Sequence, residues 1–210
     1  NYSALEALIQ RLAVGSFGLR ADRLKSYMGT TDPKKNINAI SKIIKSLAYS
    51  RNKLIEFKEF ASKLEREIFG IVLTAHPTFG MTYNMMVELA KLATSKDKNR
   101  FLSDKDLKKI VKEVFKTEQR PEKNITLDFE HQLSRSALKF LQQSLRTFYQ
   151  VILNVSKELY PDEYHTVSPQ ILRLHTWVGY DVDGRGDIFW NDSFSKRLEV
   201  KIDQLILYIE

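Results

Sequence analysis

Two polar motifs each follow a short, strand-like segment of this otherwise helical sequence. The first is T-A-H-P-T (residues 74–78), directly after the apolar run I-V-L (71–73). The second is G-Y-D-V-D-G-R-G (179–186), after an alternating segment at residues 171–178. Imidazole is the side chain whose unperturbed pKa lies near neutrality, so a strand-end histidine that faces a cavity can exchange a proton at physiological pH. His76 is therefore a candidate catalytic residue.

The residues around His76 restrict its orientation. Pro77 fixes the direction of the chain and removes a backbone donor, and Thr74 and Thr78 place hydroxyl groups beside the ring. Catalysis needs a side chain held in one orientation. A histidine that only satisfies backbone hydrogen bonds is the alternative, and the local spacing leaves both open. The other histidines, His131, His165 and His175, lack metal-ligand spacing and are interpreted as structural or surface residues.

The second motif allows two kinds of ligand chemistry. Asp181 and Asp183 could bind Ca²⁺ or Mg²⁺ through oxygen, although the further acidic residues of an EF-hand loop are missing. The alternative is a turn in which the Asp side chains bond their own backbone. Arg185, flanked by glycines, suits a carboxylate or a phosphate. Trp177 supplies either an apolar wall to a site or core packing.

Helices are expected over most of the chain. Asp32 followed by Pro33 predicts a helix start, and Ser103 with Asp106 resembles a capping box. An apolar pattern without Gly or Pro predicts one long helix from about residue 126 to 160. A last helix is expected to be capped around residues 191–193, and Gly15 with Gly18 to separate two helices near the start.

The two strand-like segments are about 100 residues apart, which excludes a tight hairpin. That spacing suits parallel strands joined by a long helical crossover. In parallel α/β proteins the carboxyl ends of the strands are where ligand chemistry collects. Both polar motifs follow such an end, so we expect them to lie close together.

Composition limits the partners. The 210 residues include no cysteine, which excludes disulfides and thiolate metal sites and favours a reducing, cytoplasmic compartment. No apolar run is long enough for a membrane span. The net charge of +7 comes from scattered basic residues without a block or a nucleic-acid-binding signature, so nucleic acid is not the expected partner. We interpret residues 1–210 as a single domain and as a piece of a longer chain.

Together, L-T-A-H-P-T (73–78) and R-L-H-T-W-V-G-Y-D-V-D-G (173–184) resemble phosphoenolpyruvate carboxylase. Members of that family carry T-A-H-P-T at one strand end and W-x-G-G-D-R-D-G-N-P at another roughly 100 residues later, in the same order. The segment K-T-E (116–118) followed by Arg120 is similar to the family's T-D-E-I-R. The chain resembles the N-terminal third of a family member, although the resemblance is specific only at the two strand ends.

The resemblance implies an enzyme that condenses phosphoenolpyruvate with bicarbonate to give oxaloacetate and phosphate. His76 would handle a proton on carboxyphosphate, and Trp177 would line the pocket that holds CO2. Arg173, Asp181 and Asp183 match positions that shape the site. Mg²⁺ or Mn²⁺ would be bound by residues outside this sequence, in a parent chain that is expected to form a homo-oligomer. The fold implied is mainly α, with long helices around two short parallel strands of an incomplete (β/α)8-type barrel.

The sequence also departs from the family pattern. F-G-M-T (79–82) stands where the family has Glu and two arginines, and Val182 stands where it has another arginine. Each lost charge-assisted bond costs roughly 1.5–3 kcal/mol. Arg185 lies three residues after Val182 and could restore part of the positive charge of the missing arginines. The missing arginines leave open a second hypothesis, a catalytically inactive relative that serves as a helical binding or regulatory module. A third hypothesis is a basic helical domain that binds nucleic acid.

Overall fold

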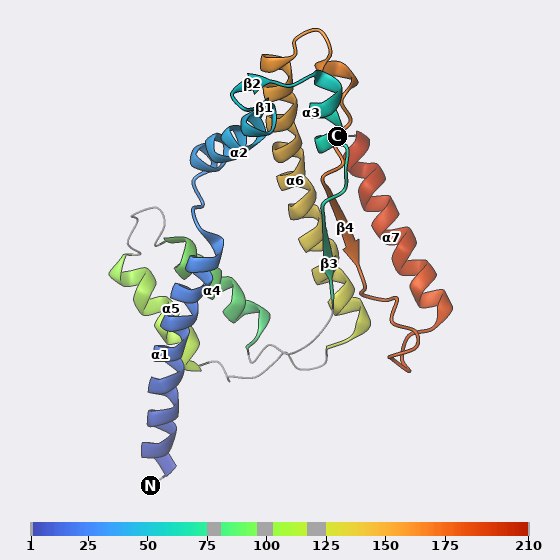
Figure 1. Ribbon diagram of the computed structural model, residues 1–210. Coiled ribbons are helices and arrows are strands. Elements are labelled where there is room, and N and C mark those ends of the chain that lie inside the picture. Colours follow the sequence, from blue (N-terminus) through green and yellow to red (C-terminus); the bar gives the residue numbers. More distant parts are fainter. Residues whose placement is uncertain (1, 75–80, 96–102, 117–124, 210) are drawn as a thin grey trace. The chain divides into compact units, whose positions relative to one another are not determined.

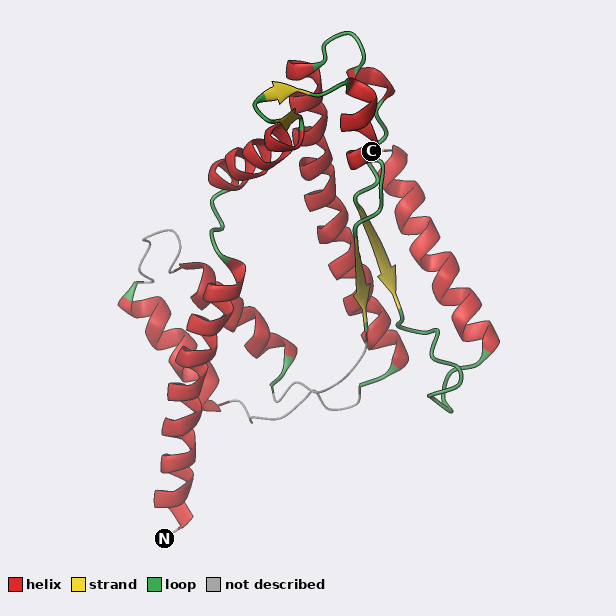
Figure 2. Cartoon of the chain, viewed as in Figure 1, coloured by secondary structure: helices red, strands yellow, loops and turns green. Residues whose placement is uncertain are grey.

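A computed structural model describes residues 2–74, 81–95, 103–116 and 125–209, which are mainly helical with a small parallel sheet (Figures 1 and 2). Contacts divide the chain into two compact units. The first comprises Asn1–Asn36 and His76–Asn124, and the second Ile37–Ala75 and Ile125–Glu210. The single domain predicted for residues 1–210 stays a prediction.

The first unit contains the helices α1 (Tyr2–Met28), α4 (Tyr83–Ser95) and α5 (Asp104–Lys116). Its buried core comes from all three helices and the residue range that leads into α4: Phe17, Met81, Met85, Ile110 and Val114. The Oγ of Ser103 accepts a hydrogen bond from the backbone N–H of Asp106 (3.2 Å). The predicted helix start at Ser103 is therefore confirmed.

The predicted break at Gly15 and Gly18 is wrong, because α1 runs through both residues as one helix. A glycine inside a helix costs only about 0.5–1 kcal/mol relative to alanine. Phe17 and Ala21, which are buried from the same helix, provide packing that offsets this cost.

The second unit is built on the long helix α6 (Leu127–Leu159), which the sequence predicted almost to its ends. The Oγ1 of Thr126 caps it by accepting from the N–H of Phe129 (3.2 Å). The other elements of this unit are α2 (Pro33–Leu47), β1 (Tyr49–Ser50), β2 (Lys53–Leu54), α3 (Phe57–Leu64), β3 (Phe69–Leu73), a 3-10 turn η1 (Tyr164–Thr166), β4 (Leu172–Thr176) and α7 (Trp190–Ile209). The first residues of α2 are counted with the first unit.

Two further helix starts were predicted from the sequence, whereas one hairpin was not. Asp32 caps α2 as predicted, its Oδ1 accepting from the N–H of Lys34 (2.9 Å). Helix α7 begins at Trp190, before the predicted cap at 191–193, because the carboxylate of Asp192 instead accepts from the N–H of Phe189 (2.9 Å). The β1–β2 hairpin was not predicted; its turn places Arg51 and Asn52 at positive φ (48° and 64°), and only the asparagine favours that conformation.

The core of the second unit packs the C-terminal half of α6 against α2 and α3. Ile152 of α6 and Phe60 and Leu64 of α3 are fully buried there. The ring of Tyr160, the residue that ends α6, stacks on Phe60 at a centroid distance of 5.1 Å. Its hydroxyl donates to the carbonyl of Ile55 (2.8 Å). This end of α6 is therefore fixed by both packing and hydrogen bonding.

Strands β3 and β4 pair in parallel, from Phe69 opposite Leu172 to Leu73 opposite Thr176. The predicted parallel pairing is confirmed. Helix α6 lies against one face of this sheet: the hydroxyl of Tyr149 donates to the carbonyl of Leu172 (3.1 Å), and Ser134 and Thr176 share a hydrogen bond (2.8 Å). The order of these contacts shows that α6 runs antiparallel to β4 (Figure 1).

We expect Ile152→Ala to lower the free energy of unfolding by about 2–5 kcal/mol, because it leaves a cavity in the core around α6. Ile43→Ala is the matched control: Ile43 is 61% exposed on α2, and its truncation should cost less than about 0.5 kcal/mol. Urea unfolding followed by circular dichroism measures both. Equal effects of the two substitutions would contradict this description of the core.

Candidate functional site

The candidate site lies at the carboxyl edge of the β3–β4 sheet, in the second unit. The N–H of Trp177 donates to the carbonyl of Leu73 (2.7 Å), so the pairing extends one residue beyond β4. Because the strands are parallel, the chain leaves both at the same edge, as the sequence predicted. The first turns of α6 reach this edge through the bond between Ser134 and Thr176. His76 lies outside the residues that the structure describes.

The loop from Trp177 to Phe189 is held by its own turns and by α7. The N–H of Arg185 donates to the carbonyl of Asp181 (3.0 Å), and the hydroxyl of Ser193 in α7 donates to the carbonyl of Gly179 (2.7 Å). The carboxylate of Asp181 lies so close to Gly184 that a Cβ there would be 2.7 Å from its oxygens. The loop thus contains a compact Asp/Gly turn that is closed by a backbone hydrogen bond.

Arg185 connects the loop to α6. Its Nε and Nη2 donate to the carboxylate of Asp187 (2.9 and 2.6 Å), and its Nη1 donates to Glu130, in the first turn of α6. The side chain of Glu130 is only 9% exposed, so this pair is largely shielded from water. Hydrogen bonds from Arg185 lower the pKa of Asp187, and those to Asp187 and Glu130 raise the pKa of Arg185. A substrate anion at Arg185 would have to compete with both carboxylates.

A second ion pair joins the start of α6 to α7 beside the same loop. Lys196 of α7 donates to Asp128 of α6, and this bond raises the pKa of Lys196 and lowers that of Asp128. The stem of Lys196 packs on Gly179, whose φ of +88° belongs to the region that favours glycine. A Cβ on residue 179 would lie 3.2 Å from Cγ of Lys196.

The remaining predicted site residues are on the exposed side of the sheet and loop. Arg173 and Trp177 alternate with residues that face α6, and Trp177 is 51% exposed. His175, which was not predicted as a site residue, lies between them on the same face. The Nε of Arg173 pairs with Glu67 (2.8 Å). Asp183 is exposed in the loop. The predicted residues therefore form two groups, one on the open sheet face and one in the 177–189 loop.

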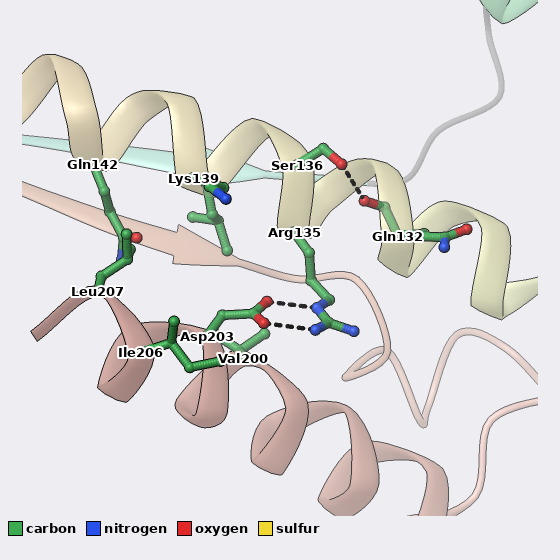
Figure 3. Close-up of a pocket in the computed structure, with 10 residues that line it drawn as sticks. Gln132, Arg135, Ser136, Lys139, Gln142, Val200, Asp203, Ile206 and Leu207 are labelled. Atoms are coloured by element: carbon green, nitrogen blue, oxygen red, sulfur yellow. Dashed lines mark hydrogen bonds and ion pairs between the residues drawn. The ribbon is translucent and has the colours of Figure 1, made fainter. Parts of the chain in front are cut away.

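Helices α6 and α7 border a pocket of about 340 Å³ that sequence reasoning missed (Figure 3). Arg135 of α6 donates two hydrogen bonds to Asp203 of α7 (2.6 Å each) and one to Glu199 (2.7 Å). The other lining residues are Gln132, Ser136, Leu138, Lys139, Gln142, Val200, Ile206 and Leu207. Arg135 and Asp203 are 68 positions apart, so no local pattern identifies the pair.

His131 is the most enclosed ionisable side chain of this region, at 1% exposure. Neither ring nitrogen has a hydrogen-bond partner within the described part of the chain, and Nε2 lies 3.6 Å from the Oε2 of Glu199. Burial lowers the pKa of its imidazole, and Lys196 and Arg135 lower it further, against the opposing effect of Glu199. The sequence analysis interpreted His131 as a structural or surface residue. The structure buries it between α6 and α7 and among their charged side chains.

The described residues do not form a metal site. Within residues 2–74, 81–95, 103–116 and 125–209, no three His, Asp or Glu side chains gather as ligands. The Asp181 carboxylate lies against Gly184 of its own turn and Asp183 is exposed, so the two aspartates alone do not supply the six oxygen ligands of Mg²⁺ or Mn²⁺. Among the same residues, none of the helices has the length and apolar character that a bilayer crossing requires.

Comparison of the chain with protein-family models, with curated proteins and with solved structures gave no match. The family resemblance therefore depends on the two motifs of the sequence.

We expect Gly179→Ala to destabilise the protein by about 1–2 kcal/mol, because alanine is strained at φ +88° and its Cβ would press on Lys196. Gly186→Ala is the control in the same loop, since no atom lies within 4 Å of a Cβ there. Thermal unfolding of both variants tests this expectation, and equal transition midpoints would contradict it.

We expect Arg185→Gln to cost about 1–3 kcal/mol, since it leaves the nearly buried carboxylate of Glu130 without its partner. The double variant Glu130→Gln/Arg185→Gln should lose less than the sum of the two single losses. Arg146→Gln, on an exposed position of α6, serves as control. Chemical unfolding measures this cycle, and strictly additive losses would show that the two side chains do not interact.

Proposed function

We propose that this chain is part of a phosphoenolpyruvate carboxylase-like enzyme, to which it contributes the catalytic histidine, His76. The observation that carries the proposal is the parallel pairing of β3 and β4. It brings to one edge of a sheet the ends of the two strands that precede T-A-H-P-T and the Trp177 motif. Two motifs that are about 100 residues apart in sequence thereby follow adjacent strand ends, as one composite site requires.

The covered and open faces of the sheet support a barrel in the complete protein. Parallel sheets are almost always covered on both faces, but here α6 covers one face, while Val72 and Trp177 on the other are 53% and 51% exposed. Each strand pairs only with the other in the described part of the chain. In a (β/α)8-type barrel the helix side would be outside, and Arg173 and Trp177 would point inward.

In the proposed reaction, phosphoenolpyruvate and bicarbonate form carboxyphosphate and the enolate of pyruvate. Carboxyphosphate then separates into CO2 and inorganic phosphate, and the enolate captures the CO2 to give oxaloacetate. His76 would accept or donate the proton on carboxyphosphate, and Trp177 would keep water from the CO2. The divalent metal would supply charge stabilisation through ligands elsewhere in the parent protein, and a homo-oligomer in the cytoplasm is proposed as its state.

We expect the parent protein to form oxaloacetate from phosphoenolpyruvate and bicarbonate with Mg²⁺, and His76→Asn to reduce kcat at least about 100-fold, because general acid–base groups contribute that much or more. His165→Asn, an exposed residue of η1, is the control and should leave kcat unchanged. Oxaloacetate is measured by coupled oxidation of NADH. Full activity of His76→Asn would overturn the role of His76. Equal losses of kcat in both variants would show that the loss is not specific to His76.

A second candidate is a catalytically inactive relative that acts as a helical binding or regulatory module. The observation that favours it is that the guanidinium of Arg185 is already hydrogen-bonded to Glu130 and Asp187. Arg185 was the residue expected to replace the family's missing arginines. A parent protein that binds phosphoenolpyruvate, or binds a protein partner, but produces no oxaloacetate under the same conditions would support this function instead.

A further inference from the structure

His131 is a buried ionisable group that the proposed reaction does not use. It lies in the second turn of α6 at 1% exposure, and neither of its ring nitrogens has a hydrogen-bond partner among the described residues. Buried polar atoms are normally paired, so an unpaired imidazole needs a physical explanation. The Oε2 of Glu199 lies 3.6 Å from its Nε2, which is too far for a hydrogen bond.

The ring is surrounded by charges from both helices that pack around it. These are Asp128 and Arg135 from α6 and Lys196, Glu199 and Asp203 from α7. Arg135 is already bonded to Asp203 and Glu199, and Lys196 to Asp128 and Glu199. The carboxylates near His131 are therefore satisfied by other cations while the imidazole is neutral.

We propose that His131 is a proton-sensitive contact between α6 and α7, whose protonation loosens the start of α7 and the 177–189 loop. A proton on the ring introduces a third cation beside Arg135 and Lys196, in a place closed to water. It competes for Glu199, which then bonds Arg135 and Lys196 less well. The burial of the charge outweighs the attraction of one carboxylate that is already shared.

The contact between α6 and α7 is linked to the 177–189 loop by packing and hydrogen bonds. Lys196 packs on Gly179 and pairs with Asp128, and Ser193 of α7 donates to the Gly179 carbonyl. Glu130, next to His131 in the sequence, accepts from Arg185 of the loop. A change in the packing of α7 against α6 therefore acts directly on the loop that carries Asp181, Asp183 and Arg185.

The direction of the pH effect follows from the burial. The pKa of His131 is lower in the folded state than the value of about 6.5 for an unfolded chain. Between these two values the unfolded chain binds more protons, so stability falls as the pH falls. The stabilising effect of the neutral ring is complete above about pH 6.5 and is lost as the pH decreases through that value toward the folded pKa.

The two tryptophans of the chain, Trp177 and Trp190, border this loop, so their fluorescence reports on it. We expect wild-type emission to change in one step as the pH is lowered from 7.5, with a midpoint below 6.5, and His131→Met to abolish the step. The urea midpoint of the wild type should fall over the same range, and that of His131→Met should fall less. A step that persists in His131→Met would overturn the proposal.

His175 needs a control because it shares a strand face with Trp177, whose fluorescence is measured. The variant His175→Gln should keep the step, and its loss there would overturn the proposal. Should His131→Met fail to fold, NMR titration of the wild-type histidines replaces it. A His131 midpoint below 6.5, with matching changes in the amide signals of Gly179 and Lys196, supports the proposal; a midpoint at or above 6.5 overturns it.

Discussion

The structure of the second unit depends on one constraint, that a helix of 33 residues must be covered along its length. Its C-terminal half buries Ile152 and Val155 against α2 and α3. Its middle contacts β4 through Tyr149, and its first turns contact α7 and the 177–189 loop mainly through charged side chains. The apolar end supplies most of the stability, because apolar burial dominates folding, whereas the polar end decides the geometry of the candidate site.

The polar end of α6 is unusual in how completely its charges are paired. Arg135, Arg185 and Lys196 each contact two carboxylates, and several of these groups are shielded from water. Such ion pairs require a defined geometry but add limited stability, since the desolvation of the charges opposes their attraction. They hold the loop after β4 in place, and they leave His131 as a neutral group among satisfied charges. The same arrangement thus positions the candidate site and makes it sensitive to protons.

Large apolar side chains remain exposed on two surfaces of the second unit. One is the open face of the β3–β4 sheet, with Val72 and Trp177. The other is the face of α7 that points away from α6: Phe194, Leu198, Ile202, Leu205 and Ile209. Contiguous apolar surface of this kind marks places where other protein segments pack. The barrel proposed for the parent protein would cover the first surface, which agrees with the ends of both strands lying at the same edge of the sheet.

The sequence by itself determined the helices with clear caps, the two strands and their parallel direction. Thr126, Asp32 and Ser103 act within three residues of the groups they cap, and alternation fixes which side of β4 faces α6. Tertiary structure decided that α1 continues through Gly15 and Gly18, and that Arg185 is bonded to Glu130 and Asp187. It also decided that His131 is buried and has no hydrogen-bond partner among the residues that the structure describes. Local patterns report interactions between residues a few positions apart, whereas the partners of Arg185 and the burial of His131 depend on helices that meet only after the chain has folded.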